Sequence, residues 1–236
     1  MEDHGHSKTE IAERLAGSGG TLHLRDMIYG GIDGAVTTFA IVAGVQGAGL
    51  SHTVIIALGV ANVLADGFSM AAGNYSGTKA DLDDRHRLSA IEQRHIHDYP
   101  DGEREELRQI LEAKGLTGTL LDQATDAIAS KPRKWIELML TDEYGLSPTP
   151  PAPMAAAIAT FLAFLAAGIV PLLPFLLGLD NPFTISIAAT AVVFFGIGAA
   201  KSRWSLAPWW RSALETLAIG STAAAIAYFV GTMFHT

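Results

Sequence analysis

The chain has 236 residues and a formal net charge of −8, and hydrophobic residues make up 49% of it. The excess of carboxylates argues against nucleic acid as a partner, because the phosphate backbone requires a basic surface. The chain has no cysteine, which excludes disulfides and thiolate metal sites. Oxygen, nitrogen and thioether atoms are then the side-chain ligands left for a metal ion.

Apolar residues gather in five long runs, which cover residues 27–50, 52–77, 154–179, 182–200 and 209–234. Most of these runs approach the roughly 20 residues with which a helix crosses about 30 Å of hydrocarbon. A helix of a soluble protein is rarely so long and so apolar on every face. We therefore predict an all-α integral membrane protein with five transmembrane helices and a small helical domain inserted between the second and the third.

Basic residues occur in only some of the connections between these runs. They precede the first run, fill the insert and flank the turn between the last two runs, whereas 47–52, 178–183 and the tail after Phe234 contain none. Since Lys and Arg accumulate on the cytoplasmic side of a membrane, we expect the N-terminus and the insert in the cytosol and the C-terminus outside. The expected segments are a cytosolic N-terminal segment (1–25), transmembrane helices 1 and 2 (26–78), the cytosolic domain (79–150) and transmembrane helices 3 to 5 (151–236).

The insert is acidic and has the composition of helices. Fifteen of the 24 carboxylates lie between Asp81 and Glu143. No proline occurs between Ser51 and Tyr99, so the second transmembrane helix should continue as one rod as far as Pro100. Three shorter amphipathic helices should follow, in "EREELRQILEAKG", "LTGTLLDQATDAIAS" and "SKPRKWIELMLTDEYGL", the last opened by Ser130.

Candidate metal ligands recur in the insert at helical spacing. Three pairs each share a helix face: Glu92 with His95, Glu103 with Glu106, and Met139 with Glu143. Ordinary solvated charge is the alternative for any one pair, and Met139 also suits a core position. The Glu-x-x-His pattern at Glu92 and His95 is shared with carboxylate-bridged di-iron bundles. A membrane-anchored di-iron oxidase and a metal-binding or storage protein therefore remain alternatives to a transporter.

Polar side chains interrupt the first two apolar runs. Asp33 lies about a third of the way along the first run, and the second carries Asn62, Asp66 and Met70. A carboxylate in hydrocarbon costs about 3 kcal/mol on insertion scales, so it normally faces water or a partner. For Asp66, a position near the cytosolic surface is the alternative. A thioether beside carboxylates suits Fe²⁺ or Mn²⁺ better than Ca²⁺, and these residues are candidates for a metal pathway.

The stretch "GGIDGAVTTFAIVAGVQGA", followed by "LADGFSMAAGNYSGTKA", resembles the vacuolar iron transporter family, and the similarity extends over nearly the whole chain. The resemblance implies a homodimer whose translocation path runs between the subunits, with Asp33 and Met70 near it. It also implies a transporter rather than an enzyme, which exports Fe²⁺ and often Mn²⁺ from the cytosol in exchange for protons. These ions would be cargo in a lipid bilayer, with no permanently bound cofactor.

The same resemblance implies that the cytosolic domain binds metal ions. The matching positions are Glu92, His95, Glu103, Glu106, Met139, Leu140 and Glu143. Three positions depart from the family pattern: His95 replaces a usual glutamate, Leu140 replaces a methionine, and Asn62 stands where many relatives carry glutamate. Imidazole protonation should make a site containing His95 sensitive to pH. We expect the host membrane to be a bacterial plasma (inner) membrane.

Overall fold

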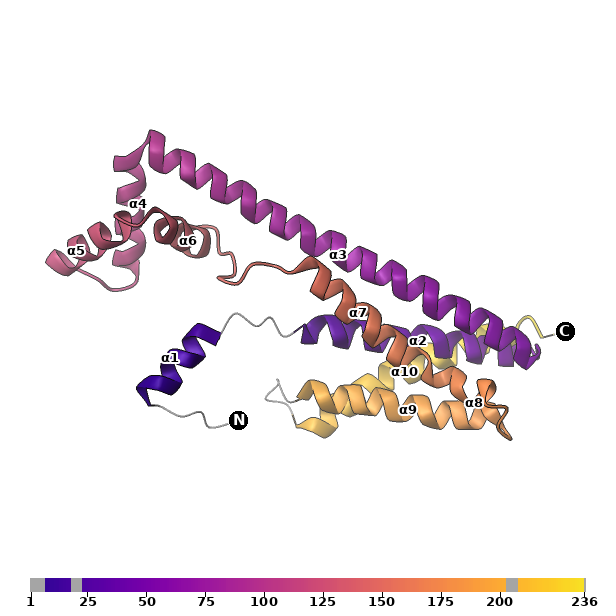
Figure 1. Ribbon diagram of the computed structural model, residues 1–236. Coiled ribbons are helices and arrows are strands. Elements are labelled where there is room, and N and C mark those ends of the chain that lie inside the picture. Colours follow the sequence, from indigo (N-terminus) through magenta and orange to yellow (C-terminus); the bar gives the residue numbers. More distant parts are fainter. Residues whose placement is uncertain (1–6, 18–22, 203–207, 236) are drawn as a thin grey trace. The chain divides into compact units, whose positions relative to one another are not determined.

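The computed structural model describes residues 7–17, 23–202 and 208–235 (Figure 1). These residues form helices and connections, with no β-strand among them. The helices in chain order are α1 (Lys8–Gly17), α2 (Leu24–Gly47), α3 (His52–Asp98), α4 (Pro100–Ala113), α5 (Gly118–Ala129), α6 (Pro132–Asp142), α7 (Pro153–Gly168), the short 3₁₀-helix η1 (Val170–Leu172), α8 (Leu173–Leu176), α9 (Pro182–Lys201) and α10 (Trp209–Thr232).

Within the described residues, five helical segments are long and apolar enough to cross a membrane. They are Leu24–Gly47, His52–Asp98, Pro153–Leu176, Pro182–Lys201 and Trp209–Thr232. The predicted all-α membrane fold with five spans is thereby confirmed. The long rod is confirmed as well, because α3 runs for 47 residues without a break and ends directly before Pro100. Helix α1, in contrast, was not anticipated from the sequence.

The chain divides into two compact units. The apolar unit consists of Leu22–Ser76 and Pro153–Thr236, and the insert unit consists of Met1–Thr21 and Gly77–Ala152. Helix α3 contributes residues to both. The apolar unit contains the five candidate spans, and the insert unit contains the acidic helices.

Helix α2 is the centre of the apolar unit, packed against α7, α9 and α10. Glycines make the approach to α7 close. A Cβ added at Gly30 would lie 2.4 Å from the carbonyl oxygen of Thr160, and one added at Gly34 would lie 2.4 Å from that of Phe164. Only glycine fits such a backbone approach, as is common between helices in membranes. Because α2 is unbroken through both positions, these glycines serve packing rather than local unwinding.

The third span is interrupted, which its apolar composition did not reveal. Helix α7 ends at Gly168, and η1 and the four-residue α8 complete the span. Pro171 and Pro174 explain the interruption, because proline has no N–H for the helical hydrogen-bond ladder. The hydroxyl of Ser186 on α9 donates a 2.7 Å hydrogen bond to the carbonyl of Pro171. This backbone carbonyl thus has a side-chain partner in an apolar setting, where backbone polar groups must be satisfied within the protein.

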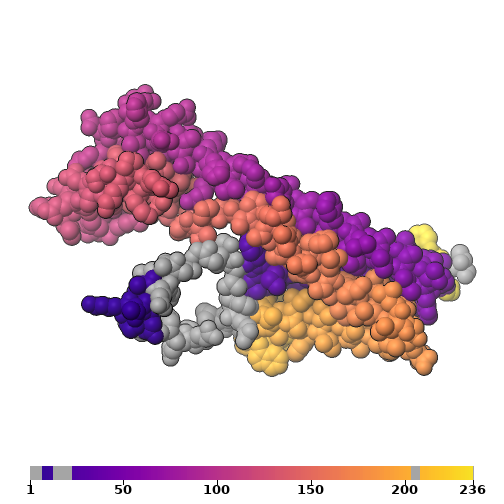
Figure 2. Space-filling view, in the orientation of Figure 1, coloured from indigo at the N-terminus to yellow at the C-terminus, as the bar shows by residue number. Residues whose placement is uncertain are grey.

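Helix α3 joins the apolar unit through side chains. Ile55 and Val63 lie in one buried cluster with Leu172, and α7 lies beside α3 on the face shown in Figure 2. Asn74 of α3 forms hydrogen bonds to the neighbouring helices. Its amide nitrogen donates to Oδ1 of Asp26 on α2 at 2.9 Å and to Oγ1 of Thr160 on α7 at 2.7 Å. One side chain therefore connects three helices at one end of the unit.

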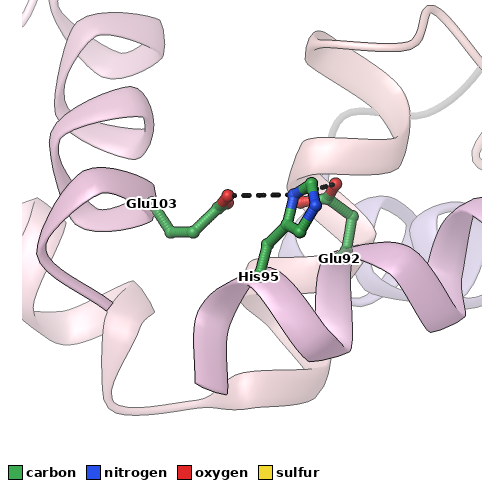
Figure 3. A group of neighbouring side chains, drawn as sticks. All are labelled: Glu92, His95 and Glu103. Atoms are coloured by element: carbon green, nitrogen blue, oxygen red, sulfur yellow. Dashed lines mark ion pairs between the residues drawn. The ribbon is translucent and has the colours of Figure 1, made fainter. Parts of the chain in front are cut away.

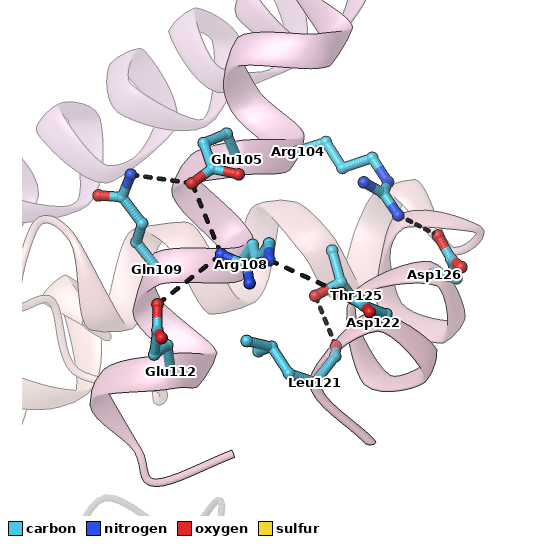
Figure 4. Close-up of polar contacts among 9 residues, drawn as sticks. All are labelled: Arg104, Glu105, Arg108, Gln109, Glu112, Leu121, Asp122, Thr125 and Asp126. Atoms are coloured by element: carbon cyan, nitrogen blue, oxygen red, sulfur yellow. Dashed lines mark hydrogen bonds and ion pairs between the residues drawn. The ribbon is translucent and has the colours of Figure 1, made fainter. Parts of the chain in front are cut away.

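The insert unit has its own hydrophobic core, formed by α4, α5 and α6. Its buried members are Leu107, Leu111, Leu121, Trp135 and Met139. Around this core, charged side chains connect α4 to α5: Arg104 pairs with Asp126, and Arg108 lies 3.6 Å from Asp122 (Figure 4). The expected opening of α6 at Ser130 was wrong by one residue. Lys131 precedes the helix, and Ser130 instead donates to the carbonyl of Ala127 at the end of α5.

Candidate metal centre

The turn between α3 and α4 creates a cluster of metal-ligating side chains. Pro100 ends α3 because it lacks an N–H and disfavours a helical residue before it, and Tyr99 accordingly leaves the helical region with φ −133°. The chain reverses there, so the first turn of α4 returns toward the last turns of α3. Glu103 of α4 thereby comes to face Glu92 and His95, which share one face of α3.

The three side chains lie within reach of one ion. One ligand atom from each of Glu92, His95 and Glu103 lies within 4.8 Å of the other two. Nδ1 of His95 is 3.3 Å from Oε1 of Glu103 and 4.0 Å from Oε1 of Glu92. Figure 3 shows the imidazole between the two carboxylates. The side chain of His95 is 46% exposed, whereas those of Glu92 and Glu103 are 1% and 8% exposed, which leaves the imidazole side accessible.

The buried carboxylates have oxygen atoms without partners. Oε2 of Glu92 and Oε2 of Glu103 are both buried, and neither has a hydrogen-bond partner among the described residues. An unpartnered buried carboxylate oxygen is costly in a folded protein, and a divalent ion removes that cost. The donor set of two carboxylates and one imidazole suits Fe²⁺, Mn²⁺ or Zn²⁺. The residues therefore fit a metal ion.

A tyrosine that the sequence analysis did not select completes this cluster. The hydroxyl of Tyr144 donates a 2.7 Å hydrogen bond to Oε1 of Glu92. Burial, followed by this hydrogen bond, raises the pKa of Tyr144 above its ordinary value, so the phenol stays a donor. The only signal in the sequence was its position next to Glu143, which is too weak to select it.

Electrostatic repulsion within the cluster shows in the pKa values. Burial raises the pKa of Glu103 to about 7, and the carboxylates of Glu92, Glu106 and Glu143 add to this while His95 opposes it. The pKa of Glu143 is also raised, first by desolvation and then by Glu92 and Glu106. Ionised carboxylates that lie close together repel one another. Protons or a bound cation can relieve this repulsion, so the two compete for such a site.

The remaining predicted ligands are arranged less uniformly. Glu106 and Glu143 are exposed and lie near enough to act on Glu103 electrostatically. Met139 is fully buried in the hydrophobic core beside Leu107 and Trp135. Leu140, where the family resemblance allows methionine, is also buried. The cluster found in the structure is thus Glu92, His95 and Glu103, and a ligand role for Glu106, Met139 and Glu143 stays a prediction.

Three of the four predicted pathway residues of the apolar unit line grooves. Asp33 lines a groove of about 610 Å³ with Arg25, Tyr29, Lys201 and other residues. Neither basic side chain forms an ion pair with Asp33 within the part of the chain that the structure describes. The carboxylate of Asp33 is half-buried, and its role in a metal pathway stays a prediction.

Asn62 and Asp66 lie in the other groove, between α2 and α3. This groove has a volume of about 570 Å³ and is also lined by Thr37 and Ser69. Met70, half-buried on α3, is among the lining residues of neither groove. Within one protomer, Asp33 and Met70 therefore do not share a groove, and their predicted meeting near a path between two subunits stays a prediction.

Comparison with known proteins agrees with these features. Residues 24–232 match the VIT family. The chain is 33% identical over 208 residues to Vacuolar iron transporter 2 of Oryza sativa subsp. japonica, covering 87% of this chain and 85% of that protein. It is 32% identical over 226 residues to Vacuolar iron transporter 1 of the same plant, covering 94% and 89%. It is 28% identical over 225 residues to Vacuolar iron transporter of Toxoplasma gondii, covering 90% and 74%.

The matched region contains all five candidate spans and the complete Glu92, His95 and Glu103 cluster. This chain belongs to the VIT family.

Proposed function

We propose that this protein is a membrane transporter of Fe²⁺, and of Mn²⁺ as a second cargo, rather than an enzyme. The grouping of Glu92, His95 and Glu103 with unpartnered carboxylate oxygens carries the proposal, because these side chains could hold a divalent cation in a multi-pass membrane protein. The names of the relatives, which are vacuolar iron transporters, support iron as the cargo.

In the proposed mechanism the insert unit collects metal ions and the apolar unit moves them across the membrane. In the insert unit, Glu103 and its neighbours collect metal ions from the cytosol. In the apolar unit, Asp33 binds the metal when ionised and takes up a proton when the metal leaves, so that each cation excludes the other. This exclusion couples metal export to proton entry. Two copies of the chain would form the path between them, each contributing Asp33 and Met70.

The proposed setting is a bacterial plasma membrane with the insert in the cytosol, although the plant relatives are named for the vacuole. A di-iron oxidase would use the same ligand types at Glu92 and His95. The two functions differ in their need for oxygen. Detergent-solubilised oxidase would consume Fe²⁺ only with oxygen present, whereas a transporter moves it under anaerobic conditions as well.

Metal entry into sealed proteoliposomes tests the proposal. Vesicles containing a metal-sensitive dye are prepared with the parent chain, with Asp33→Ala and with Glu103→Ala, and Fe²⁺ is added anaerobically under an opposing proton gradient. We expect near-complete loss of uptake with Asp33→Ala. We expect partial loss with Glu103→Ala, because collection is impaired and the membrane route is intact.

Two outcomes would contradict the proposal. No uptake by the parent chain would reject transport and leave a binding or storage protein. Equal uptake by all three chains would reject the assigned residues. A matched control is Asp81→Asn, which removes an exposed carboxylate of α3 outside the cluster and both grooves and should leave uptake unchanged.

A further inference from the structure

One face of α2 forms the wall of a groove that is aliphatic along its length and basic at one end. The α2 residues in the lining recur in pairs four residues apart, so they form one continuous face of the helix. Leucine, isoleucine and valine supply most of the lining. The complete set is Leu24, Arg25, Ile28, Tyr29, Ile32, Asp33 and Val36 of α2, Lys201 of α9 and Ile219 of α10.

Both basic residues of this groove lie at the same end of the apolar unit. Helix α2 begins there at Leu24 and α10 at Trp209, and α9 ends there at Lys201 (Figure 1). Arg25 is exposed and forms no ion pair with any residue in the described part of the chain. Nζ of Lys201 lies 3.5 Å from Oε2 of Glu215, and both side chains are exposed, so this contact is weak. The end of the groove therefore carries a positive charge that the chain does not compensate.

Aromatic side chains place this end at the level of a membrane interface. Trp209 and Trp210 are exposed at the start of α10, and Tyr29 is exposed one turn after Arg25. Tryptophan and tyrosine are enriched where lipid headgroups meet hydrocarbon, because their rings are apolar and carry one polar group. Arg25 and Lys201 thus lie at headgroup depth, and the groove runs from there into the hydrocarbon.

The groove has the length of one lipid leaflet. From Leu24 to Val36 the helix advances about 18 Å, at about 1.5 Å per residue. One leaflet supplies half of about 30 Å of hydrocarbon, which is about 15 Å. The groove has a volume of about 610 Å³. Its length and its aliphatic wall suit a single extended acyl chain.

We infer that this groove binds an anionic phospholipid, with its phosphate at Arg25 and Lys201 and one acyl chain along Ile28, Ile32 and Val36. Basic pockets between spanning helices bind anionic headgroups, and the guanidinium group matches the oxygens of a phosphate. A zwitterionic lipid brings a cationic group to the same basic end, and a soluble anion gains nothing from the aliphatic wall. The inference goes beyond the proposed transport function and does not depend on it.

Carboxylates near the groove do not exclude this phosphate. Asp33 is eight residues from Arg25, about 12 Å along the helix, which exceeds the distance of about 10 Å over which salt screens exposed charges. Asp26 is next to Arg25 in the sequence, but it is not a lining residue, and its two oxygens contact His23 and Asn74.

Native mass spectrometry of the full-length protein in detergent tests the headgroup preference. The protein is titrated with phosphatidylglycerol, or with phosphatidylcholine that has the same acyl chains, and the apparent Kd of the first bound lipid is measured. We expect phosphatidylglycerol to bind at least tenfold more tightly. Equal Kd values for the two lipids would overturn the anionic headgroup site.

Charge variants locate the phosphate. Each basic residue near an anionic lipid surface contributes about fivefold to affinity, so Arg25→Gln with Lys201→Gln should raise the Kd for phosphatidylglycerol about 25-fold. The Kd for phosphatidylcholine should stay within twofold. Arg211→Gln is the matched control, because Arg211 is a basic residue of the same helix ends that lies over the Trp210 ring and not in the groove. An equal effect of Arg211→Gln and Arg25→Gln would overturn the site.

A groove-filling variant tests the place of the acyl chain. Ile32→Trp puts a larger side chain into the middle of the aliphatic wall, and we expect it to raise the Kd of both lipids at least fivefold. Soluble glycerol 3-phosphate, which has the anion without the chains, should not displace phosphatidylglycerol at a hundredfold excess. Unchanged lipid binding in Ile32→Trp, or displacement by glycerol 3-phosphate, would overturn the lipid assignment.

The same spectra report the number of protein chains in each particle. If a second copy of the chain occupied this groove, Arg25→Gln with Lys201→Gln would lower the dimer fraction and leave the Kd for phosphatidylglycerol unchanged, which would overturn the inference. If the double variant cannot be purified, Arg25→Gln alone gives the result. A Kd for phosphatidylglycerol raised about fivefold then supports the site, and an unchanged Kd overturns it.

Discussion

The phenol of Tyr144 holds the carboxylate of Glu92 through a 2.7 Å hydrogen bond from a residue 52 positions further along the chain. Glu92 is almost fully buried, and its second oxygen has no partner within the described residues. The hydrogen bond fixes Oε1 of Glu92, the same oxygen that lies 4.0 Å from Nδ1 of His95 in the cluster. Groups that orient a metal ligand in this way commonly contribute about 10-fold to 100-fold to metal affinity.

We therefore expect Tyr144→Phe to weaken Mn²⁺ binding to the insert unit by about tenfold, at the lower end of the usual range for such an orienting group. Titration calorimetry on the full-length protein in detergent measures the change. Tyr99→Phe is the matched control, because Tyr99 is 70% exposed and lies between α3 and α4. Equal affinity in Tyr144→Phe and the parent would mean that Glu92 is oriented by its packing alone.

The raised pKa of Glu103 makes the metal-free insert unit less stable as the pH rises. The pKa increases from 4.5 in the unfolded chain to about 7 in the folded one, so between these values the folded state binds more protons. The free energy of unfolding then falls as pH rises through this window, and the whole loss is present above pH 7. Its upper bound is about 3 kcal/mol, since one pKa unit corresponds to about 1.4 kcal/mol.

Hydrogen exchange of the α4 amides, corrected for intrinsic rates, measures this effect in the full-length protein at pH 5 and pH 8. Protection should decrease between the two, and Glu103→Gln should flatten the dependence. Glu105→Gln, which changes an exposed carboxylate on the same helix, should retain it. Added Mn²⁺ should restore protection at pH 8. A parent-like slope in Glu103→Gln would assign the effect to other groups.

Gly34 sets the distance between α2 and α7, and we expect Gly34→Ala to lower stability. An added Cβ would lie 2.4 Å from the carbonyl oxygen of Phe164, which belongs to rigid helical backbone. The helices must separate, at a cost of about 1 to 3 kcal/mol for an overpacked contact. Thermal unfolding in detergent measures the change, with a lower Tm expected.

Gly73→Ala is the matched control for this substitution. Gly73 is also helical, and a Cβ added there would meet nothing within 4 Å. Since alanine has the higher helix propensity, this variant should have an equal or higher Tm. A similar decrease in both variants would show that helix flexibility, rather than the approach to α7, explains the effect.

Much of the architecture could be predicted from local sequence patterns. Run length and hydropathy located the five spans, and the lack of proline before Pro100 predicted the continuous α3. The interruption at Pro171 was not predicted, because the third run is strongly apolar over its whole length and reads as one continuous span. The carbonyl of Pro171 is supported by Ser186 from another helix, and no local pattern records such a partner.

The candidate site was predictable only in part. The spacing of Glu92 and His95 indicated a shared helix face, which the cluster retains. Tyr144 was missed because its role depends on a contact over 52 positions. Asp33, Asn62 and Asp66 were grouped as pathway residues because each is polar within an apolar run. In the structure Asp33 lines one groove, and Asn62 and Asp66 line another. Polarity in a span indicates function, but it does not indicate which residues meet.

The sequence by itself determined the helical membrane class, the places of the five spans and the residue types able to bind a metal ion. These properties depend on hydropathy, period and proline position, which act over a few turns of chain. Only the tertiary structure decided that Glu103 returns to His95, that Tyr144 orients Glu92 and that Thr37 faces Asn62. Each of these contacts depends on how helices turn and pack, because side chains distant in sequence meet only where the backbone brings them together.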